Sequence, residues 1–230
     1  MRGLWLALLL VSCSPVVTHL PRQPLAVMSA LPLFWGEGGP TAVLQGGDQR
    51  AAITRQLAQS WDLRPIDRLD ASALQHMRVL LLAQPRGLSP DELVALDGWV
   101  RGGGRVIIFA DPMLRWPSAL PLGDKRRAPQ ITLLDPLLDH WELTLDGGVD
   151  GAEAFLEVDG KRAAGAGMGR WKANLPGCKV SGDARWVTCQ IGKGRALLVG
   201  DADVLDLEDV PENREAVDAL FARLARLARK

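Results

Sequence analysis

Four acidic side chains stand just beyond apolar, strand-like segments of the sequence, and they are Glu37, Asp111, Asp201 and Asp203. If these segments form strands of one parallel sheet, their carboxyl ends open at the same edge, where ligands of such sheets bind. We therefore expect the four carboxylates to gather in one crevice. Carboxylate oxygens in that arrangement offer a hard site for a cation or for sugar hydroxyls.

Each of these residues also has a purely structural interpretation, because an acidic side chain at a strand end commonly caps the next turn or helix. Trp35, which ends the first apolar segment, is either a stacking surface for a ligand or part of the core. Carboxylates of Glu37 and Asp111 within about 10 Å of each other across an open cleft would favour a hydrolase. If they cap backbone amides instead, that hypothesis loses its best residues.

No other pattern in the sequence indicates a catalytic or metal site. His19, His76 and His140 lack a partner at ligand spacing. There is no Gly-x-Ser-x-Gly elbow, residues 165–169 are expected to form a flexible turn, and residues 192–195 lack the P-loop spacing. We thus predict no cofactor. The 27 basic and 27 acidic residues balance, so charge gives no reason to expect a nucleic acid partner.

The N-terminus has the pattern of a bacterial lipoprotein signal. One arginine precedes the apolar run at 4–11, which is far shorter than the ~20 residues of a membrane-spanning helix. It leads into Leu-Val-Ser-Cys at 10–13, which resembles a lipobox and makes Cys13 the expected lipidation site. An ordinary secretory signal and an uncleaved anchor are the alternatives. We expect a lipid-anchored protein of the cell envelope with its domain in the periplasm.

The signal also defines the expected organisation of the chain. Residues 1–12 are the predicted signal peptide, and residues 13–24, with three prolines, form the predicted extended tether. Residues 25–230 are enough for a single α/β domain with its own core.

Cys178 and Cys189 remain as an even pair on either side of a Ser-Gly-Asp turn signal. In a hairpin centred between Asp183 and Ala184 they would lie directly opposite each other. Opposed residues have α-carbons ~4.5–5.5 Å apart, which suits a disulfide. We expect this bond to form, and two free cysteines are the alternative.

Hydrophobic patterns predict a sheet flanked by helices. Buried strands are expected at four apolar runs, 25–35, 77–83, 105–110 and 195–200. Helices are expected over 50–61, after the capping box at 89–92, over 133–141, and from Pro211 with Asp209 as N-cap. Strand, helix, strand in close succession implies a parallel sheet. The short alternating runs of 152–191 indicate an antiparallel β-rich segment, so the predicted class is α/β.

Two longer segments resemble the GldG-like auxiliary proteins of ABC-type transport systems. Residues 88–112 are similar to their central motif, and residues 191–203 to their glycine-rich C-terminal strand with its acidic end. Residues 135–145 and 213–215 fit the same pattern, so the resemblance covers most of 80–225. It implies a flavodoxin-like, glutamine-amidotransferase-like domain without the catalytic cysteine of true amidotransferases. The chain departs from larger members in having one leader and no C-terminal transmembrane helix.

The leading hypothesis is therefore a non-enzymatic envelope lipoprotein whose α/β domain binds a ligand or a protein partner, as an auxiliary of an ABC-type system. Its expected partners are the membrane, through the lipid, and an envelope or transporter protein. The alternatives are a hydrolase acting on a sugar or envelope polymer through the acidic crevice, and a structural scaffold without a pocket.

Overall fold

The computed structural model describes residues 22–37, 50–148 and 153–226. Cys13, the predicted signal peptide and most of the predicted tether lie outside these residues. Within the described ranges no helix is both long and apolar enough to span a bilayer.

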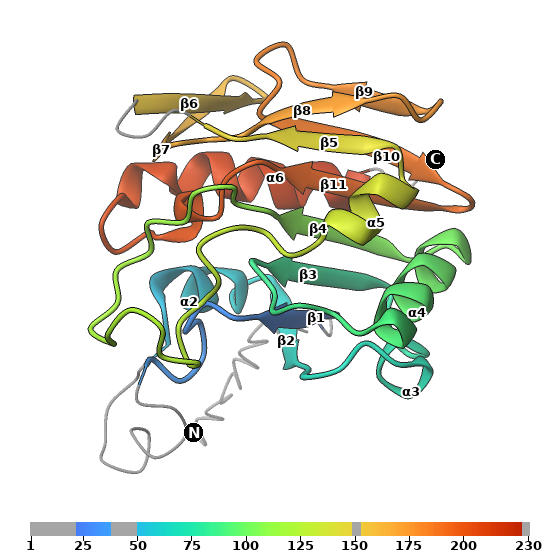
Figure 1. The fold of residues 1–230 in the computed structure, drawn as a ribbon, viewed down its shortest axis with the longest axis horizontal. Helices are drawn as coiled ribbons and strands as arrows, with labels where there is room; N and C mark the ends of the chain where they lie inside the picture. Colours follow the sequence, from blue (N-terminus) through green and yellow to red (C-terminus); the bar gives the residue numbers. More distant parts are fainter. Residues whose placement is uncertain (1–21, 38–49, 149–152, 227–230) are drawn as a thin grey trace, which may run out of the picture.

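A seven-stranded sheet forms the centre of the fold, in the order β2-β1-β3-β4-β11-β10-β9 (Figure 1). The five strands β2, β1, β3, β4 and β11 are parallel to one another, and β10 and β9 extend the sheet as an antiparallel hairpin. Their bounds are β1 Gln23–Ser29, β2 Trp61–Pro65, β3 Val79–Ala83, β4 Arg105–Phe109, β9 Cys178–Val180, β10 Trp186–Ile191 and β11 Gly194–Val199. The predicted α/β class with a mostly parallel sheet is confirmed.

Helices cover both faces of the sheet, because successive residues of the buried strands point to opposite sides. In β3, Leu81 packs in one core cluster and Leu80 and Leu82 in the other. The first cluster includes side chains of α2 (Ala52–Leu57) and α6 (Arg214–Arg226), and the second those of α3 (Ala71–Leu74), α4 (Pro90–Arg101) and α5 (Asp135–His140).

Two small antiparallel pairs complete the predicted β-rich segment. Strands β5 (Leu143–Asp146) and β8 (Arg170–Ala173) form one pair, and β6 (Glu153–Val158) and β7 (Lys161–Ala166) form the other. The flexible turn predicted at 165–169 is wrong in part. Gly165 belongs to β7, where its lack of a side chain lets the strand pass close to Asp201.

Several predicted boundaries shift. Strand β1 ends at Ser29 and not near Trp35, because the Ser29 hydroxyl donates to Ala83 O and accepts from Leu31 N, which turns the chain. The last helix has no Asp209 cap. Residues 211–213 form a 3₁₀ turn, η2, and α6 begins after it.

The capping box of α4 is present as predicted, with Ser89 and Glu92 bonded to each other's backbone amides. Cys178 and Cys189 lie opposite each other in the β9–β10 pair and are joined by a disulfide in the structure, with α-carbons 4.0 Å apart.

Candidate functional site

Asp111, Asp201 and Asp203 meet at the carboxyl ends of two adjacent strands. Phe109 of β4 pairs with Val199 of β11, so Asp111 and Asp201 each stand two residues beyond a matched pair. One carboxylate oxygen of each of the three residues lies within 4.8 Å of those of the other two. The structure thus brings together three of the four acidic residues that the sequence placed in one crevice.

The backbone of Asp111 is fixed by its neighbours. Its N–H donates to the Gln84 side-chain oxygen (2.9 Å), and its carbonyl accepts from Gln84 Nε2 (3.2 Å) and Thr132 N (2.7 Å). Gln84 is fully buried at the end of β3 and has a positive φ of 41°. It therefore anchors the second residue after β4 to the neighbouring strand.

Backbone amides occupy four of the six carboxylate oxygens of the cluster. Asp111 accepts from Met113 N (2.7 Å) and Ala202 N (2.9 Å), one through each oxygen. Oδ1 of Asp201 accepts from Val204 N (2.9 Å), and Oδ2 of Asp203 from Arg115 N (2.8 Å).

The other two oxygens, Oδ2 of Asp201 and Oδ1 of Asp203, are buried and have no hydrogen-bond partner among the described residues. Buried polar atoms are nearly always satisfied in folded proteins, so this pair marks an unusual site.

Burial disfavours the charged forms of all three carboxyls, and repulsion by neighbouring carboxylates adds to this at Asp201 and Asp203. Burial raises the pKa of Asp111 above its usual value. The pKa of Asp201 is raised well above its usual value by burial and then by the charges of Asp111 and Asp203. Burial, followed by the charge of Asp111, raises the pKa of Asp203 to about 7. Near neutral pH this cluster therefore has a strong tendency to take up protons or another positive charge.

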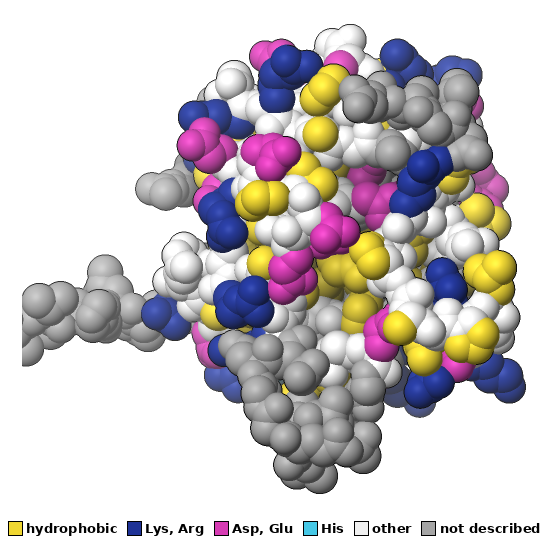
Figure 2. Space-filling view, turned by 90° about the vertical axis from the view of Figure 1, so that its left-hand side faces the viewer, with side chains coloured by type: hydrophobic (Ala, Val, Ile, Leu, Met, Phe, Trp, Pro, Cys, Tyr) yellow, Lys and Arg dark blue, Asp and Glu magenta, His cyan; other side chains and the backbone are white. Residues whose placement is uncertain are grey.

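A pocket of about 350 Å³ opens at Asp203. Asp206 and Asp209 add two acidic groups to its wall, and the half-exposed ring of Phe155 adds an apolar one. Gly165 lines it too, and a Cβ on this residue would lie 2.4 Å from Oδ2 of Asp201. Figure 2 views the molecule from the edge that the β3 and β4 arrowheads face in Figure 1. Acidic side chains there surround an apolar hollow.

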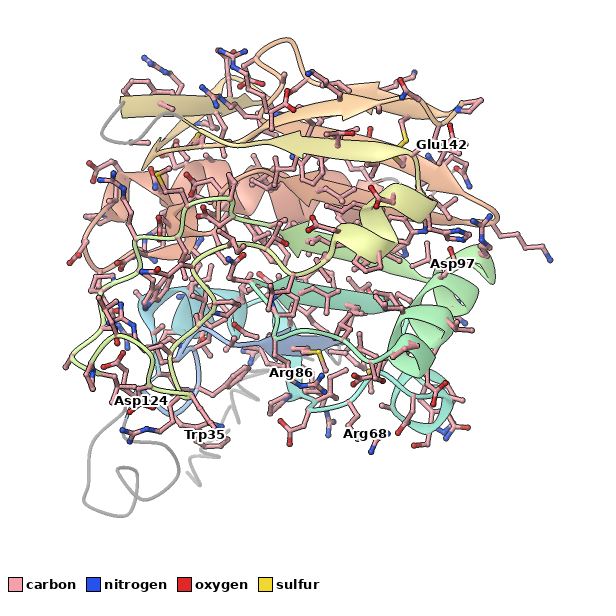
Figure 3. The ribbon with its side chains drawn as sticks, in the orientation of Figure 1. Trp35, Arg68, Arg86, Asp97, Asp124 and Glu142 are labelled. Carbon is pink, nitrogen blue, oxygen red and sulfur yellow. A yellow bond between two sulfur atoms is a disulfide. The ribbon has the colours of Figure 1, made fainter. Side chains whose placement is uncertain are left out.

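Glu37 and Trp35 lie apart from this cluster. Glu37 accepts from Ala119 N (2.8 Å) and lines a separate hollow of about 390 Å³, together with Arg126 and Arg127. Trp35 is 46% exposed, and its side chain lies at the periphery of the molecule (Figure 3). The predicted single crevice is therefore two hollows. Because the chain crosses between them at 114–115, Leu114 lines one and Arg115 the other.

The two carboxylates on which the hydrolase hypothesis depended both cap backbone amides. Glu37 accepts from Ala119 N, and both oxygens of Asp111 are occupied in the same way. The hydrolase hypothesis therefore loses its best residues, because both side chains serve to hold loop backbone in place.

Sequence reasoning missed two residues that shape the cluster, Gln84 and Gly165. The position of Gln84 directly after the buried run 77–83 was a usable signal. Like the aspartates, it is a polar side chain at the carboxyl end of a parallel strand. Gly165 had no such signal, because its role depends on the packing of β7 against a distant turn.

A sequence profile for the family described as "ABC-type uncharacterized transport system" matches residues 22–153. The comparison with curated proteins gave no match.

Several solved structures share the fold at low sequence identity. The mmIFT52 N-terminal domain has a TM-score of 0.58 at 15% identity, covering 88% of this chain and 97% of that one. The cytoplasmic protein STM3548 from Salmonella typhimurium has 0.52 at 11% identity, covering 86% and 97%. The exo-β-1,4-mannosidase Op5Man5 from Opitutaceae bacterium strain TAV5 has 0.51 at 13% identity, covering 88% of this chain and 36% of that one. These likenesses agree with the predicted glutamine-amidotransferase-like fold.

Proposed function

This chain belongs to the family of ABC-type uncharacterized transport systems, in which it is an auxiliary component, and we propose that it works there as an envelope lipoprotein that binds a ligand or a partner protein. Binding takes place at the edge of the sheet where β4 and β11 end.

The unpartnered oxygens of Asp201 and Asp203 beside an open pocket are the observation that carries this proposal. A buried acceptor without a donor costs roughly 1–3 kcal/mol. A molecule that supplies positive charge or donors at this point would recover that free energy. Phe155 beside the acidic groups offers the apolar surface that such ligand sites commonly contain.

A binding role fits these residues better than hydrolysis does. The carboxylates that could have formed a catalytic pair hold loop backbone in place, and neither Cys178 nor Cys189 is available as a nucleophile because they are bonded to each other. Rigid loops around a pocket favour recognition, because less conformational entropy is lost on binding.

Anchoring through Cys13 would keep the domain beside its transport system. The anchor rests on the lipobox-like sequence Leu-Val-Ser-Cys and on the short apolar run before it. A lipid and a tether confine the domain near the membrane, which raises its effective concentration toward a membrane partner.

Metabolic labelling with an alkyne palmitate, followed by affinity purification from detergent-solubilised membranes, tests both parts. The wild type should carry the label and co-purify with subunits of an ABC-type transporter identified by mass spectrometry. Cys13→Ser should lose the label and most of the transporter subunits. Normal labelling of Cys13→Ser would contradict the anchor, and absence of transporter subunits from the labelled wild type would contradict the partnership.

A further inference from the structure

We propose that Asp111, Asp201 and Asp203 together hold one divalent cation of the hard, oxygen-preferring class, such as Ca²⁺, Mg²⁺ or Mn²⁺. This inference deepens the proposed function, because it names the ion that occupies the inner end of the binding pocket. It rests on the proposed function for the role of that pocket.

The spacing of the three carboxylates suits a single ion. Ca²⁺ binds oxygen ligands at about 2.3–2.6 Å, so two oxygens on opposite sides of one ion are roughly 5 Å apart. One oxygen from each of Asp111, Asp201 and Asp203 lies within 4.8 Å of the others. All three therefore fit inside one coordination shell.

The buried, unpartnered oxygen of Asp201 is an independent sign of a missing ligand. Asp201 is 1% exposed, and while its Oδ1 is bonded to Val204 N, its Oδ2 meets no donor among the described residues. Oδ1 of Asp203, a residue that lines the pocket, is likewise buried and without a donor among the described residues. A cation held beyond the carboxyl ends of β4 and β11 would satisfy both atoms.

Neighbouring arginines do not take this place. The guanidinium of Arg185 interacts electrostatically with Asp201, but it donates its hydrogen bonds to the carbonyls of Met168 and Gly169. Arg115 contacts Asp203 through its backbone N–H, and its charge acts on that carboxyl more weakly than burial does. Neither arginine is a hydrogen-bond donor to Oδ2 of Asp201 or Oδ1 of Asp203, which have no such partner among the described residues.

Three carboxylates leave coordination positions open, and the pocket is where these would be filled. Asp203 lines the pocket, so an ion beside it can complete its shell with water or with oxygen atoms of a bound ligand. The ion would also link the turns after β4 and β11, which form the wall of the pocket.

Isothermal titration of the detergent-solubilised full chain tests this site with the metal salts alone. The protein is first stripped with EDTA, then titrated at pH 7.5 with CaCl₂, MgCl₂ or MnCl₂. At least one of them should bind at one site and raise the unfolding temperature. Because the ion displaces protons, the measured heat should also depend on the ionisation enthalpy of the buffer.

Matched variants decide whether the cluster is the site. Asp201→Asn and, at the pocket mouth, Asp203→Asn should each lower the affinity at least tenfold. Asp139→Asn, an exposed change on α5, should leave it unchanged. Circular dichroism shows which variants fold. If Asp201→Asn does not fold, Asp203→Asn alone tests the site.

Three results would overturn the proposal. They are no binding of any of the three ions at millimolar concentration, equal binding by folded cluster variants, and an unfolding temperature that follows pH but not metal. If the EDTA-treated chain still co-purifies with its transporter while metal binding fails, the proposed function survives and the cation site alone is wrong.

Discussion

The side chain of Asp111 accepts a hydrogen bond from the backbone amide of Ala202, 91 residues further along the chain, at 2.9 Å. This contact joins the turn after β4 to the turn after β11, and Asp203 returns a second one by accepting from Arg115 N. The two turns therefore hold each other in place and set the geometry of the acidic cluster between them.

Neutralising Asp203 should stabilise the metal-free protein. Its pKa of about 7 in the folded state lies above its ordinary value, so the folded chain binds this proton more tightly than the unfolded chain, and stability falls as pH rises from about 4 to 7. We expect Asp203→Asn to raise the free energy of unfolding in EDTA at pH 8 by roughly 2 kcal/mol. The gain should nearly vanish at pH 4. Urea unfolding at the two pH values checks this, and an equal gain at both would contradict it.

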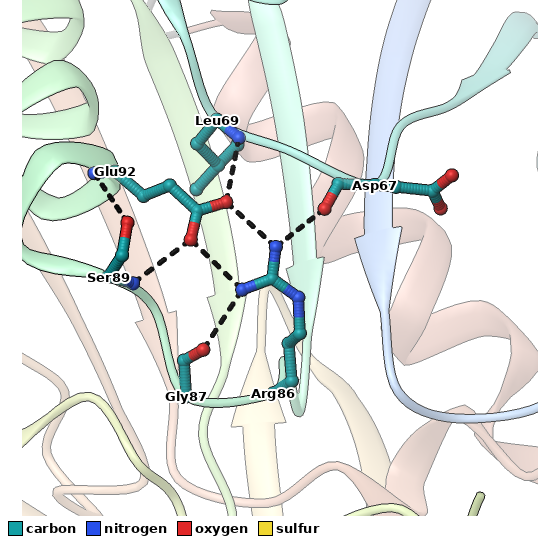
Figure 4. Close-up of polar contacts among 6 residues, drawn as sticks. All are labelled: Asp67, Leu69, Arg86, Gly87, Ser89 and Glu92. Carbon is teal, nitrogen blue, oxygen red and sulfur yellow. Dashed lines mark hydrogen bonds and ion pairs between the residues drawn. The ribbon is translucent and has the colours of Figure 1, made fainter.

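The ion pair between buried Glu92 and half-exposed Arg86 should control the acid stability of the α4 end (Figure 4). Glu92 also accepts from the amides of Leu69 and Ser89, and the hydrogen bonds from Arg86 lower its pKa to about 2. A lowered carboxyl pKa stabilises the fold above pH 4.5, and this contribution is lost as pH falls toward 2. Because water screens the half-exposed Arg86, Glu92→Gln should cost roughly 1–2 kcal/mol at pH 7.

Urea unfolding of Glu92→Gln at pH 7 and pH 3 measures both effects, with the exposed neighbour Asp91→Asn as the control. The difference between wild type and Glu92→Gln should shrink at pH 3. A difference of the same size at both pH values would show that the charge of Glu92 is not the cause.

Reduction of the Cys178–Cys189 disulfide should destabilise the fold without unfolding it at room temperature. The bond closes a short loop across the β9–β10 pair, with a sequence separation of 11. In the chain-entropy model such a loop contributes about 3 kcal/mol. Thermal unfolding with and without reductant measures the loss. The double variant Cys178→Ser/Cys189→Ser should be insensitive to reductant, and a wild type that is equally insensitive would contradict the prediction.

The fold was largely predictable because its strands and helices have strong local signals. The runs that became β3, β4 and β11 are apolar apart from Arg105 and Arg195 near the strand starts, as expected of strands buried on both faces, and the capping box marked the start of α4. Boundaries set by tertiary contacts were not predictable. The start of α6 was one of these, because the Asn213 side chain bonds both backbone groups of Ala164 in β7.

The site was predictable only where strand ends decide it. Asp111, Asp201 and Asp203 follow adjacent parallel strands, so the sheet brings them together. Glu37 follows β1 after an irregular stretch of several residues, and that stretch carries it to a different hollow. The antiparallel β6–β7 pair, which supplies Phe155 and Gly165 to the pocket, could be expected as a β-rich segment but not placed against the cluster.

Photo-crosslinking in the native envelope tests the central claim most directly. A crosslinking amino acid replaces Phe155 at the pocket or, as the matched control, the exposed Val94 on the other face of the sheet. We predict that the probe at 155 captures a subunit or ligand of an ABC-type transporter and that the probe at 94 captures neither. Equal capture from both positions, or capture only from 94, would contradict the assignment of binding to this edge of the sheet.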